Sequence, residues 1–285
     1  DFCLSRGLGD VYKRQAQVCR GELEGIIGRR HYLDSLSNFA DDGKRASDRP
    51  PPTGQNGRMT RSVALELAVQ DPTGVRIAGA VGAVRVELAQ ALPLGGLTPS
   101  PATLDLSIDA ARAVGVEVHV LVRPRAGGFT YSADEIAIAE SDVRRAIEAG
   151  ADGVVIGALD EEGLLDIPAM RRLRDAAGGA SVTLHRAIDV TPDPVATLVA
   201  ARDLGLRRVL TSGGASVAID GIDTLRALVA EAAGEIEIMA GSGVDAASAP
   251  ALVAAGVDAL HFSAKRMVHE LSLIHISEPT RQAEI

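Results

Sequence analysis

The feature that most constrains this chain is a regular alternation between short apolar runs and longer segments that end in Gly. Phrases such as EAGADGVVI and AAGVDALHF each close one segment and open the next apolar run. Strands that alternate with helices predict a parallel α/β fold. Eight repeats favour a single closed (β/α)8 TIM barrel over an open sheet. No GxGxxG follows the first strand, which weakens a dinucleotide-binding interpretation.

The boundaries follow from turn and cap residues. The expected strands are 63–69, 84–89, 116–123, 153–158, 181–186, 208–212, 236–240 and 259–262. The expected helices are 72–82, a segment ending at 115, 132–150, 167–177, 194–204, 221–233 and 245–255. Asp71 and Ser132 are the expected N-caps of two of these helices.

The third expected strand has one polar face and leads into a Gly-rich loop. In VEVHVLVRPRAGGFTYS, residues 116–132, Val occupies one face, and Glu117, His119 and Arg123 occupy the other. A polar face opposite a Val stripe fits a strand whose polar side looks into a barrel. A charged strand end that leads into a Gly-rich loop is typical of a working mouth.

The net charge of the chain argues against some classes of binding partner. The chain of 285 residues has a formal net charge of -9, so neither nucleic acid nor an anionic membrane is an expected partner. No apolar run approaches the roughly 18 residues of a transmembrane helix, and no signal peptide is recognisable. The polar barrel mouth instead favours a small-molecule or anionic ligand. Assembly as a homo-oligomer stays open.

The two ends differ from the rest. The first methionine is Met59, and residues 1–58 lack any helix or strand period. CLSRGLGDVYKRQ and LSLIHISEPTRQ resemble translated sequencing-adapter read-through. We expect 1–58 to be upstream, non-native or disordered sequence, 59–270 to be the barrel, and 271–285 to be an artefactual tail. Both cysteines, Cys3 and Cys19, lie in the first segment.

Period-two alternation assigns one face of each strand to the barrel interior. The inward residues are Ala64, Glu66, Ala68, Arg85, Glu87, Ala89, Glu117, His119, Arg123, Thr183, His185, Glu237, Met239, His261 and Ser263. Barrel interiors are usually filled by branched apolar side chains, and buried charges persist only when paired.

Position along the strand separates two interpretations. Arg85, Glu117 and Glu237 come early in their strands, where structural ion pairs and a site are equally expected. The late inward residues predict a functional site; they are Glu66, Glu87, His119, Arg123 and His185. A structural ion-pair lattice of Glu66, Arg85, Glu87 and Arg123 is the alternative.

The segment MAGSGV, 239–244, suggests an anion site. Gly241 and Gly243 permit close approach of a ligand to the backbone, and Asp245 is expected to open the next helix. Loops after the seventh and eighth strands, with Ser263 at the end of the eighth, form the common phosphate site of such barrels.

Six ordered motifs resemble the copper homeostasis protein CutC family. They are GGLTPS (95–100), VHVLVRPRAGGFTYS (118–132), DGVVIGALDEEGLLD (152–166), TLHRAID (183–189), LTSGG (210–214) and IMAGSGV (238–244). The resemblance spans about 63–266 and implies a (β/α)8 barrel, a role in copper tolerance, copper as a ligand and a cytoplasmic location. The matching site positions are Glu66, Glu87, His119, Arg123, Arg125, His185, Arg186, Asp189, Thr211 and Ser212.

This sequence departs from the family pattern at the positions proposed to bind copper. Ala68 and Ala89 stand where the family has the cysteines proposed as copper ligands, and Gly128 replaces a usual Asp. Cu(I) prefers thiolate or thioether ligands, so the copper role implied by the resemblance fits this member poorly.

Three functions follow, and whether the chain is an enzyme stays open. The first is copper homeostasis, with copper binding or copper trafficking as the activity that the resemblance implies. The second is an enzyme acting on a small phosphorylated or anionic metabolite, with Glu66 or Glu87 as base, His119 or His185 as proton donor or electrophile, and Arg123 and Arg125 on the anion. The third is an isomerase or hydrolase whose divalent metal binds Glu66, Glu87, His119 and His185. The remaining candidate ligand contacts are Arg186, Asp189, Thr211, Ser212, Gly241, Gly243 and Ser263.

Overall fold

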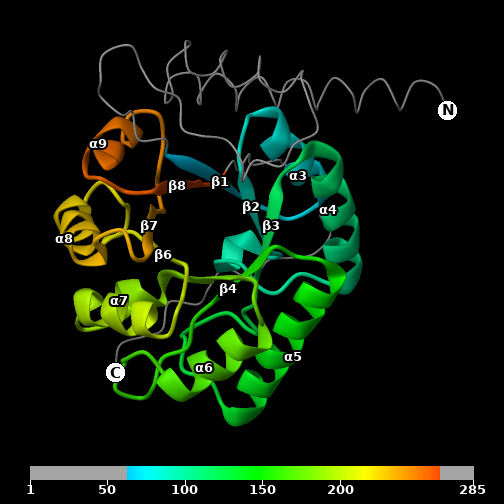
Figure 1. Ribbon diagram of the computed structural model, residues 1–285, viewed down its shortest axis with the longest axis horizontal. Helices are drawn as coiled ribbons and strands as arrows, with labels where there is room; N and C mark the ends of the chain where they lie inside the picture. The colour runs from blue at the N-terminus through cyan, green and yellow to red at the C-terminus, as the bar shows by residue number, and fades with distance from the viewer. Residues whose placement is uncertain (1–62, 264–285) are drawn as a thin grey trace, which may run out of the picture.

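The computed structural model describes residues 63–263 of the chain. Eight parallel strands close into a barrel in chain order, and the last strand pairs with the first. Helices form a ring outside the strands (Figure 1). The expected (β/α)8 barrel is therefore confirmed. The expectations for 1–58 and 271–285 lie outside the described residues.

The strands are β1 (Ala64–Val69), β2 (Arg85–Leu88), β3 (Glu117–Leu121), β4 (Gly153–Ile156), β5 (Ser181–Leu184), β6 (Arg208–Thr211), β7 (Glu237–Ala240) and β8 (Ala259–Phe262). The helices are α3 (Pro72–Ala80), α4 (Pro101–Val114), α5 (Ala133–Ala149), α6 (Ile167–Ala176), α7 (Pro194–Asp203), α8 (Ile222–Ala232) and α9 (Ala249–Ala254). Two short 3-10 helices, η2 (Leu92–Leu94) and η3 (Arg186–Val190), follow β2 and β5.

Local sequence explains where most helices begin and end. The Ser132 side chain accepts the backbone N–H of Glu135, and the Glu135 side chain accepts that of Ser132, so α5 opens with a capping box. Gly115 ends α4 with φ +70°, a left-handed conformation that glycine adopts without steric cost. These caps let the sequence place α4 and α5 closely.

The alternation in β3 separates two cores. Val118 and Val120 are buried in the main core, between the strands and the surrounding helices. Leu121, on the opposite face, packs with Ala89 and Val155 inside the barrel. The Val stripe therefore faces the helices, and the polar face of the strand looks inward, as expected.

The last helix differs from the expectation. The sequence predicted a helix from Asp245, but α9 begins at Ala249. The Asp245 carboxylate instead accepts the backbone N–H groups of Ala247 and Ser248 and the Ser248 hydroxyl. Asp245 therefore closes a turn in the loop after β7, because these nearby donors satisfy it before a helix starts.

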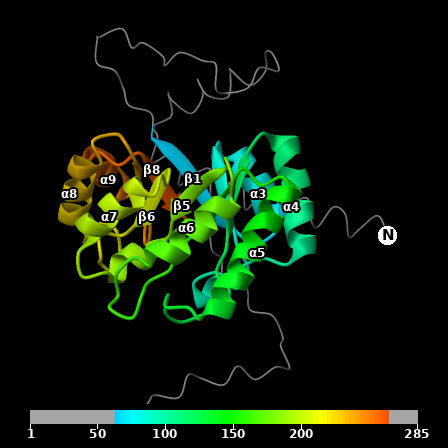
Figure 2. The same ribbon diagram turned by 60° about the horizontal axis from the view of Figure 1, so that its bottom comes forward.

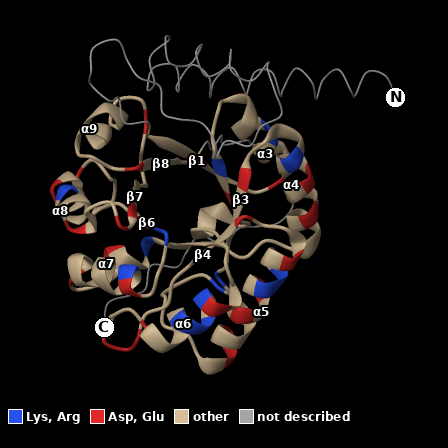
Figure 3. Cartoon of the chain, in the orientation of Figure 1, with Lys and Arg blue, Asp and Glu red and all other residues tan. Residues whose placement is uncertain are grey.

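Many of the charged residues lie on the outer helices, and others lie on the strands and loops (Figure 3). Arg172 of α6, for example, contacts Glu140 of α5 at 2.6 Å. A view turned by 60° shows the helices packed around the strands (Figure 2). No helix among residues 63–263 combines the length and the apolar character needed to span a bilayer.

Candidate functional site

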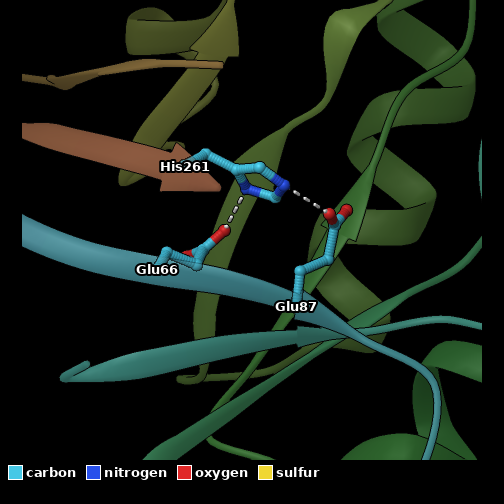
Figure 4. Close-up of side chains that lie close together, drawn as sticks. All are labelled: Glu66, Glu87 and His261. Atoms are coloured by element: carbon cyan, nitrogen blue, oxygen red, sulfur yellow. Dashed lines mark hydrogen bonds and ion pairs between the residues drawn. The ribbon is translucent and has the colours of Figure 1, made fainter. Parts of the chain in front are cut away.

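Three side chains from adjacent strands meet inside the barrel (Figure 4). Glu66 of β1 lies beside His261 of β8 in the sheet register, and Glu87 comes from β2. His261 Nδ1 lies 3.0 Å from Glu66 Oε1, and His261 Nε2 lies 3.3 Å from Glu87 Oε2. Arg85 forms an ion pair with the other oxygen of Glu66. One imidazole thus links two buried carboxylates.

The electrostatics favour a charged imidazole. Burial lowers the pKa of His261, but the hydrogen bond to Glu66 and the charges of Glu87 and Glu66 outweigh burial and raise the pKa above its usual value. Burial raises the pKa of Glu66, yet His261 and Arg85 together bring it well below its usual range. Burial raises the pKa of Glu87. The cluster therefore holds an imidazolium between an ionised Glu66 and a Glu87 that protonates more easily.

The same cluster offers the donors of a divalent-metal site, since ligand atoms of Glu66, Glu87 and His261 lie within 4.8 Å of one another. The metal hypothesis had grouped both glutamates with His119 and His185, and the structure places His261 there instead. Both ring nitrogens of His261 face carboxylates, and Arg85 already neutralises Glu66. A divalent ion would compete with the imidazolium proton for the carboxylates.

A pocket of about 420 Å³ opens above this cluster. Its floor includes Glu87 and His261, and its walls come from loops that follow the strands. Among the predicted site residues it is lined by Glu87, Arg123, His185, Arg186, Gly243 and Ser263. The other predicted residues do not line it; they are Glu66, His119, Arg125, Asp189, Thr211, Ser212 and Gly241. Such a concave, partly apolar mouth with a few convergent polar groups is typical of a small-molecule site.

His119 lies in a lower layer of the barrel. Its Nε2 is 3.8 Å from the carboxylate of Glu117, and its ring packs so closely on Gly153 that a Cβ there would lie 2.7 Å from Cε1. Burial is the main reason why the pKa of His119 falls to about 3. His119 is therefore a neutral side chain that lies below the pocket and does not line it.

Early inward charges form structural ion pairs. Arg208 Nη2 contacts Glu237 at 2.5 Å, and its Nη1 donates to the Thr183 hydroxyl. Arg85 lies 4.0 Å from Glu117 and pairs with Glu66. Each of these inward charges thus has a partner, which offsets the cost of burying it.

Arg123 and Arg125 hold loops together. Arg123 Nη1 donates to the carbonyls of Leu94 and Gly96, and its Nη2 donates to that of Gly127. Arg125 pairs with Glu135 at 2.5 Å and donates to three backbone carbonyls, of Ala126, Gly128 and Thr130. Arg123 still contributes its charge to the pocket, whereas Arg125 stands outside it.

Asp189 organises the wall next to β6. Its carboxylate accepts the Thr211 hydroxyl at 2.5 Å and the Ser212 backbone N–H at 3.0 Å. The Ser212 hydroxyl, the backbone N–H of Gly214 and the Nε of Arg186 also donate to it, at 3.0, 3.1 and 2.7 Å. Asp189, Thr211 and Ser212 thus support Arg186 from behind the pocket surface.

The two glycines after β7, Gly241 and Gly243, lie in different surroundings. A Cβ on Gly241 would lie 2.5 Å from Leu210 Cδ1, so a larger residue at that strand end would require the Leu210 side chain to move. Gly243, with φ +62°, lines the pocket, and the preceding Ser242 donates its hydroxyl to the carbonyl of Ser216. The sequence predicted a helix N-terminus at Asp245, close behind these glycines, but α9 begins only at Ala249.

His261 was missing from the predicted site. The alternation rule placed it inward, but nothing in its neighbourhood distinguished it from other inward residues. The signal available in the sequence was that strands β8 and β1 must be neighbours in a closed barrel. Their residues at matching height would have paired His261 with Glu66.

The closed barrel and its polar pocket define a TIM-barrel protein with a pocket at the carboxyl ends of its strands. A deoxyribose phosphate aldolase from Aeropyrum pernix shares this fold with a TM-score of 0.55 at 16% identity, covering 70% of this chain and 85% of that one. At such low identity the likeness concerns the fold alone.

Comparison with known families is more specific. The CutC family profile matches residues 63–266. The family protein CutC of Xanthomonas campestris pv. campestris (strain 8004) is 43% identical over 217 residues, which cover 76% of this chain and 89% of that protein. The crystal structure of a putative copper homeostasis protein CutC from Streptococcus agalactiae matches with a TM-score of 0.68 and 31% identity, over 72% of this chain and 99% of that one. The chain belongs to the CutC family.

Proposed function

We propose that the pocket binds a small polar metabolite and that Glu87 exchanges a proton with it. The observation that carries this proposal is the Glu66–His261–Glu87 cluster, because two of its members line the pocket floor. General acid–base catalysis needs a carboxyl group whose pKa is raised toward neutrality and which can reach the ligand. Glu87 meets both requirements.

The other two members support Glu87. His261 holds a positive charge beside it, anchored by Glu66 on the far side. The imidazolium attracts the carboxylate form of Glu87 and so opposes part of the rise in pKa that burial causes. Pairs of titratable groups whose environments push their pKa values apart are the usual basis of acid and base assignments.

Hydrogen exchange tests this role directly. Metabolites that raise the melting temperature of the full chain would be incubated with it in D2O, and deuterium incorporation at their C–H positions followed by NMR. We expect exchange with the wild type and a loss of about 100-fold or more with Glu87→Gln, the scale of a removed general base. The control is Arg226→Gln, on the outer helix α8. Exchange by Glu87→Gln at the wild-type rate would refute the role of Glu87.

Copper homeostasis is the second candidate function. Family membership supports it, as does the name of the Streptococcus agalactiae protein. The donor set of the described residues does not fit a Cu(I) site. It contains no cysteine; Ala68 lines the pocket and Ala89 is buried with Leu121. Met239 is fully buried, and its sulfur lies 3.9 Å from Arg85. Soft donors therefore do not converge.

A Cu(I) titration against a competing chelator separates the two candidates. The full chain would carry Cys3→Ser and Cys19→Ser, so that the terminal thiols cannot bind copper. We expect binding no tighter than about micromolar, or about -8 kcal/mol. Nanomolar binding would support the copper role. A cytoplasmic location stays a prediction, and assembly as a homo-oligomer stays open.

A further inference from the structure

We propose that the pocket takes a small anionic compound whose carbonyl or hydroxyl oxygen accepts a hydrogen bond from His185 and whose carboxylate or phosphate binds Arg186. This inference rests on the proposed function, because it concerns the same pocket, and it names the class of ligand. The two residues are consecutive, at the point where β5 ends and η3 begins.

His185 presents a hydrogen-bond donor of defined identity. The backbone N–H of Ala187 donates to His185 Nδ1 at 3.1 Å. A backbone N–H can only donate, so Nδ1 accepts, and in the neutral ring the proton is on Nε2. That Nε2 is buried and has no partner within residues 63–263, while His185 itself lines the pocket. A buried donor without an acceptor is costly, and a ligand oxygen would satisfy it.

The ring of His185 is held in place. Phe129 packs against it with the ring centroids 4.7 Å apart. On the other side a Cβ at Gly157 would lie only 2.4 Å from its Cε1, so the ring occupies the space that glycine leaves. Burial, together with the charge of Arg123, lowers the pKa of His185 to about 3. His185 is therefore a neutral, fixed donor, which suits an oxygen acceptor and not an exchanged proton.

Arg186 presents a free edge beside it. Its Nε donates to Asp189 at 2.7 Å, and its Nη2 donates to the hydroxyl of Ser212 at 2.9 Å. Its Nη1 has no hydrogen-bond partner in the described part of the chain, and the side chain is 41% exposed where it lines the pocket. Arg123, by contrast, has both of its Nη groups occupied by backbone carbonyls. Arg186 is thus the guanidinium arranged to bind an anion.

Charge and hydrogen bonding together define the ligand. Arg186 and Arg123 give this wall a positive potential, and His185 offers a donor and no acceptor. A carboxylate or phosphate with a nearby carbonyl or hydroxyl satisfies both. A cation such as ethanolammonium satisfies neither, since its ammonium group needs an acceptor and is repelled by the arginines.

Binding to the full chain tests the ligand class. The probes are pyruvate, with a carboxylate and a carbonyl; dihydroxyacetone phosphate, with a phosphate; dihydroxyacetone, which is neutral; and ethanolamine. Dissociation constants would be measured at pH 7 by NMR titration. We expect at least one anion to bind about ten-fold or more tightly than dihydroxyacetone, a difference of about 1.4 kcal/mol. The tighter anion identifies carboxylate or phosphate. Equal affinities, or no binding of either anion below about 10 mM, would overturn the proposal.

Variants assign the two contacts. Arg186→Gln should remove the preference for anions over dihydroxyacetone, while Arg226→Gln, an equal loss of charge on α8, should keep it. His185→Leu should weaken binding of the favoured anion about ten-fold, and His185→Gln, which retains an N–H donor, should recover part of it. Unchanged affinity in Arg186→Gln would contradict the assignment, even if the His185 variants fail to fold.

The binding experiments on the anion and the deuterium-exchange experiment on Glu87 can succeed or fail independently. Anion preference that depends on Arg186 supports the ligand class whether or not any probe exchanges deuterium. Glu87-dependent exchange on a neutral or cationic compound, with no anion preference, would keep the proposed acid–base role and refute this inference.

Discussion

Replacing Glu66 by Gln probes the cluster on which the site is built. Glu66 is fully buried and pairs with both Arg85 and His261. Gln keeps the shape and removes the charge. Breaking a buried ion pair by removing one partner costs about 3–5 kcal/mol, because the other charge stays buried. Arg85 would be left with Glu117, which is 4.0 Å away and more than half exposed, so little compensation is available.

The expected loss depends on pH in a defined direction. The pKa of His261 is raised in the folded state, so its stabilisation is present below the unfolded value of 6.5 and is lost as pH rises through the folded pKa. The pKa of Glu66 is lowered, so its contribution is present above 4.5 and is lost as pH falls. The difference in unfolding free energy between wild type and Glu66→Gln should therefore be largest between pH 4.5 and pH 6.5, where both contributions are fully present.

Urea unfolding of the full chain at pH 5.5 and pH 9 measures this difference. We expect a loss of about 3–5 kcal/mol at the lower pH, out of a total of about 5–15 kcal/mol for a typical domain, and a smaller loss at the higher pH. The control is Asp223→Asn, which removes the exposed partner of Arg226 on α8 and should change little. A loss of less than about 1 kcal/mol at pH 5.5 would refute the buried, ionised pair.

Three further outcomes are expected. Gly157→Ala should displace the ring of His185, with a loss of about 1–3 kcal/mol in unfolding free energy and weaker binding of the favoured anion; thermal unfolding and the NMR titration would show both, and an unchanged anion affinity would contradict the fixed-ring argument. Asp189→Asn should release Arg186 and reduce anion affinity more than it reduces that for dihydroxyacetone; equal reductions would show a general loosening of the wall. Ser132→Ala should cost about 1 kcal/mol by removing the α5 cap, measured by urea unfolding, with no change in ligand affinity; a change in affinity would mean that the cap also shapes the pocket.

Much of the fold was readable because its signals are local. A strand period of two, Gly at helix ends and Ser132 at an N-cap act within a few residues of one another. The late start of α9 was not predicted, because an Asp at this position can either cap a helix or accept hydrogen bonds in a turn. Its environment, not its position in the sequence, decided between them.

The candidate site was readable only in part. Glu66 and Glu87 could be placed inward from alternation, but the rule gives the face of a strand and not the height in the barrel. His119 is inward as well, yet it lies one layer below the pocket, and His261 lies at its floor. Height depends on strand tilt and register, which couple all eight strands.

The sequence by itself determined the eight-stranded barrel, the polar character of its interior and the family to which the resemblance pointed, since each rests on patterns along the chain. Only the tertiary structure decided which of three similar arginines is available to a ligand. The Nη groups of Arg123 and Arg125 donate to backbone carbonyls of loops, whereas Arg186 is held by Asp189 with its Nη1 open. Hydrogen-bond partners that come from separate loops exist only after the chain has folded, and for that reason no local pattern could distinguish the three.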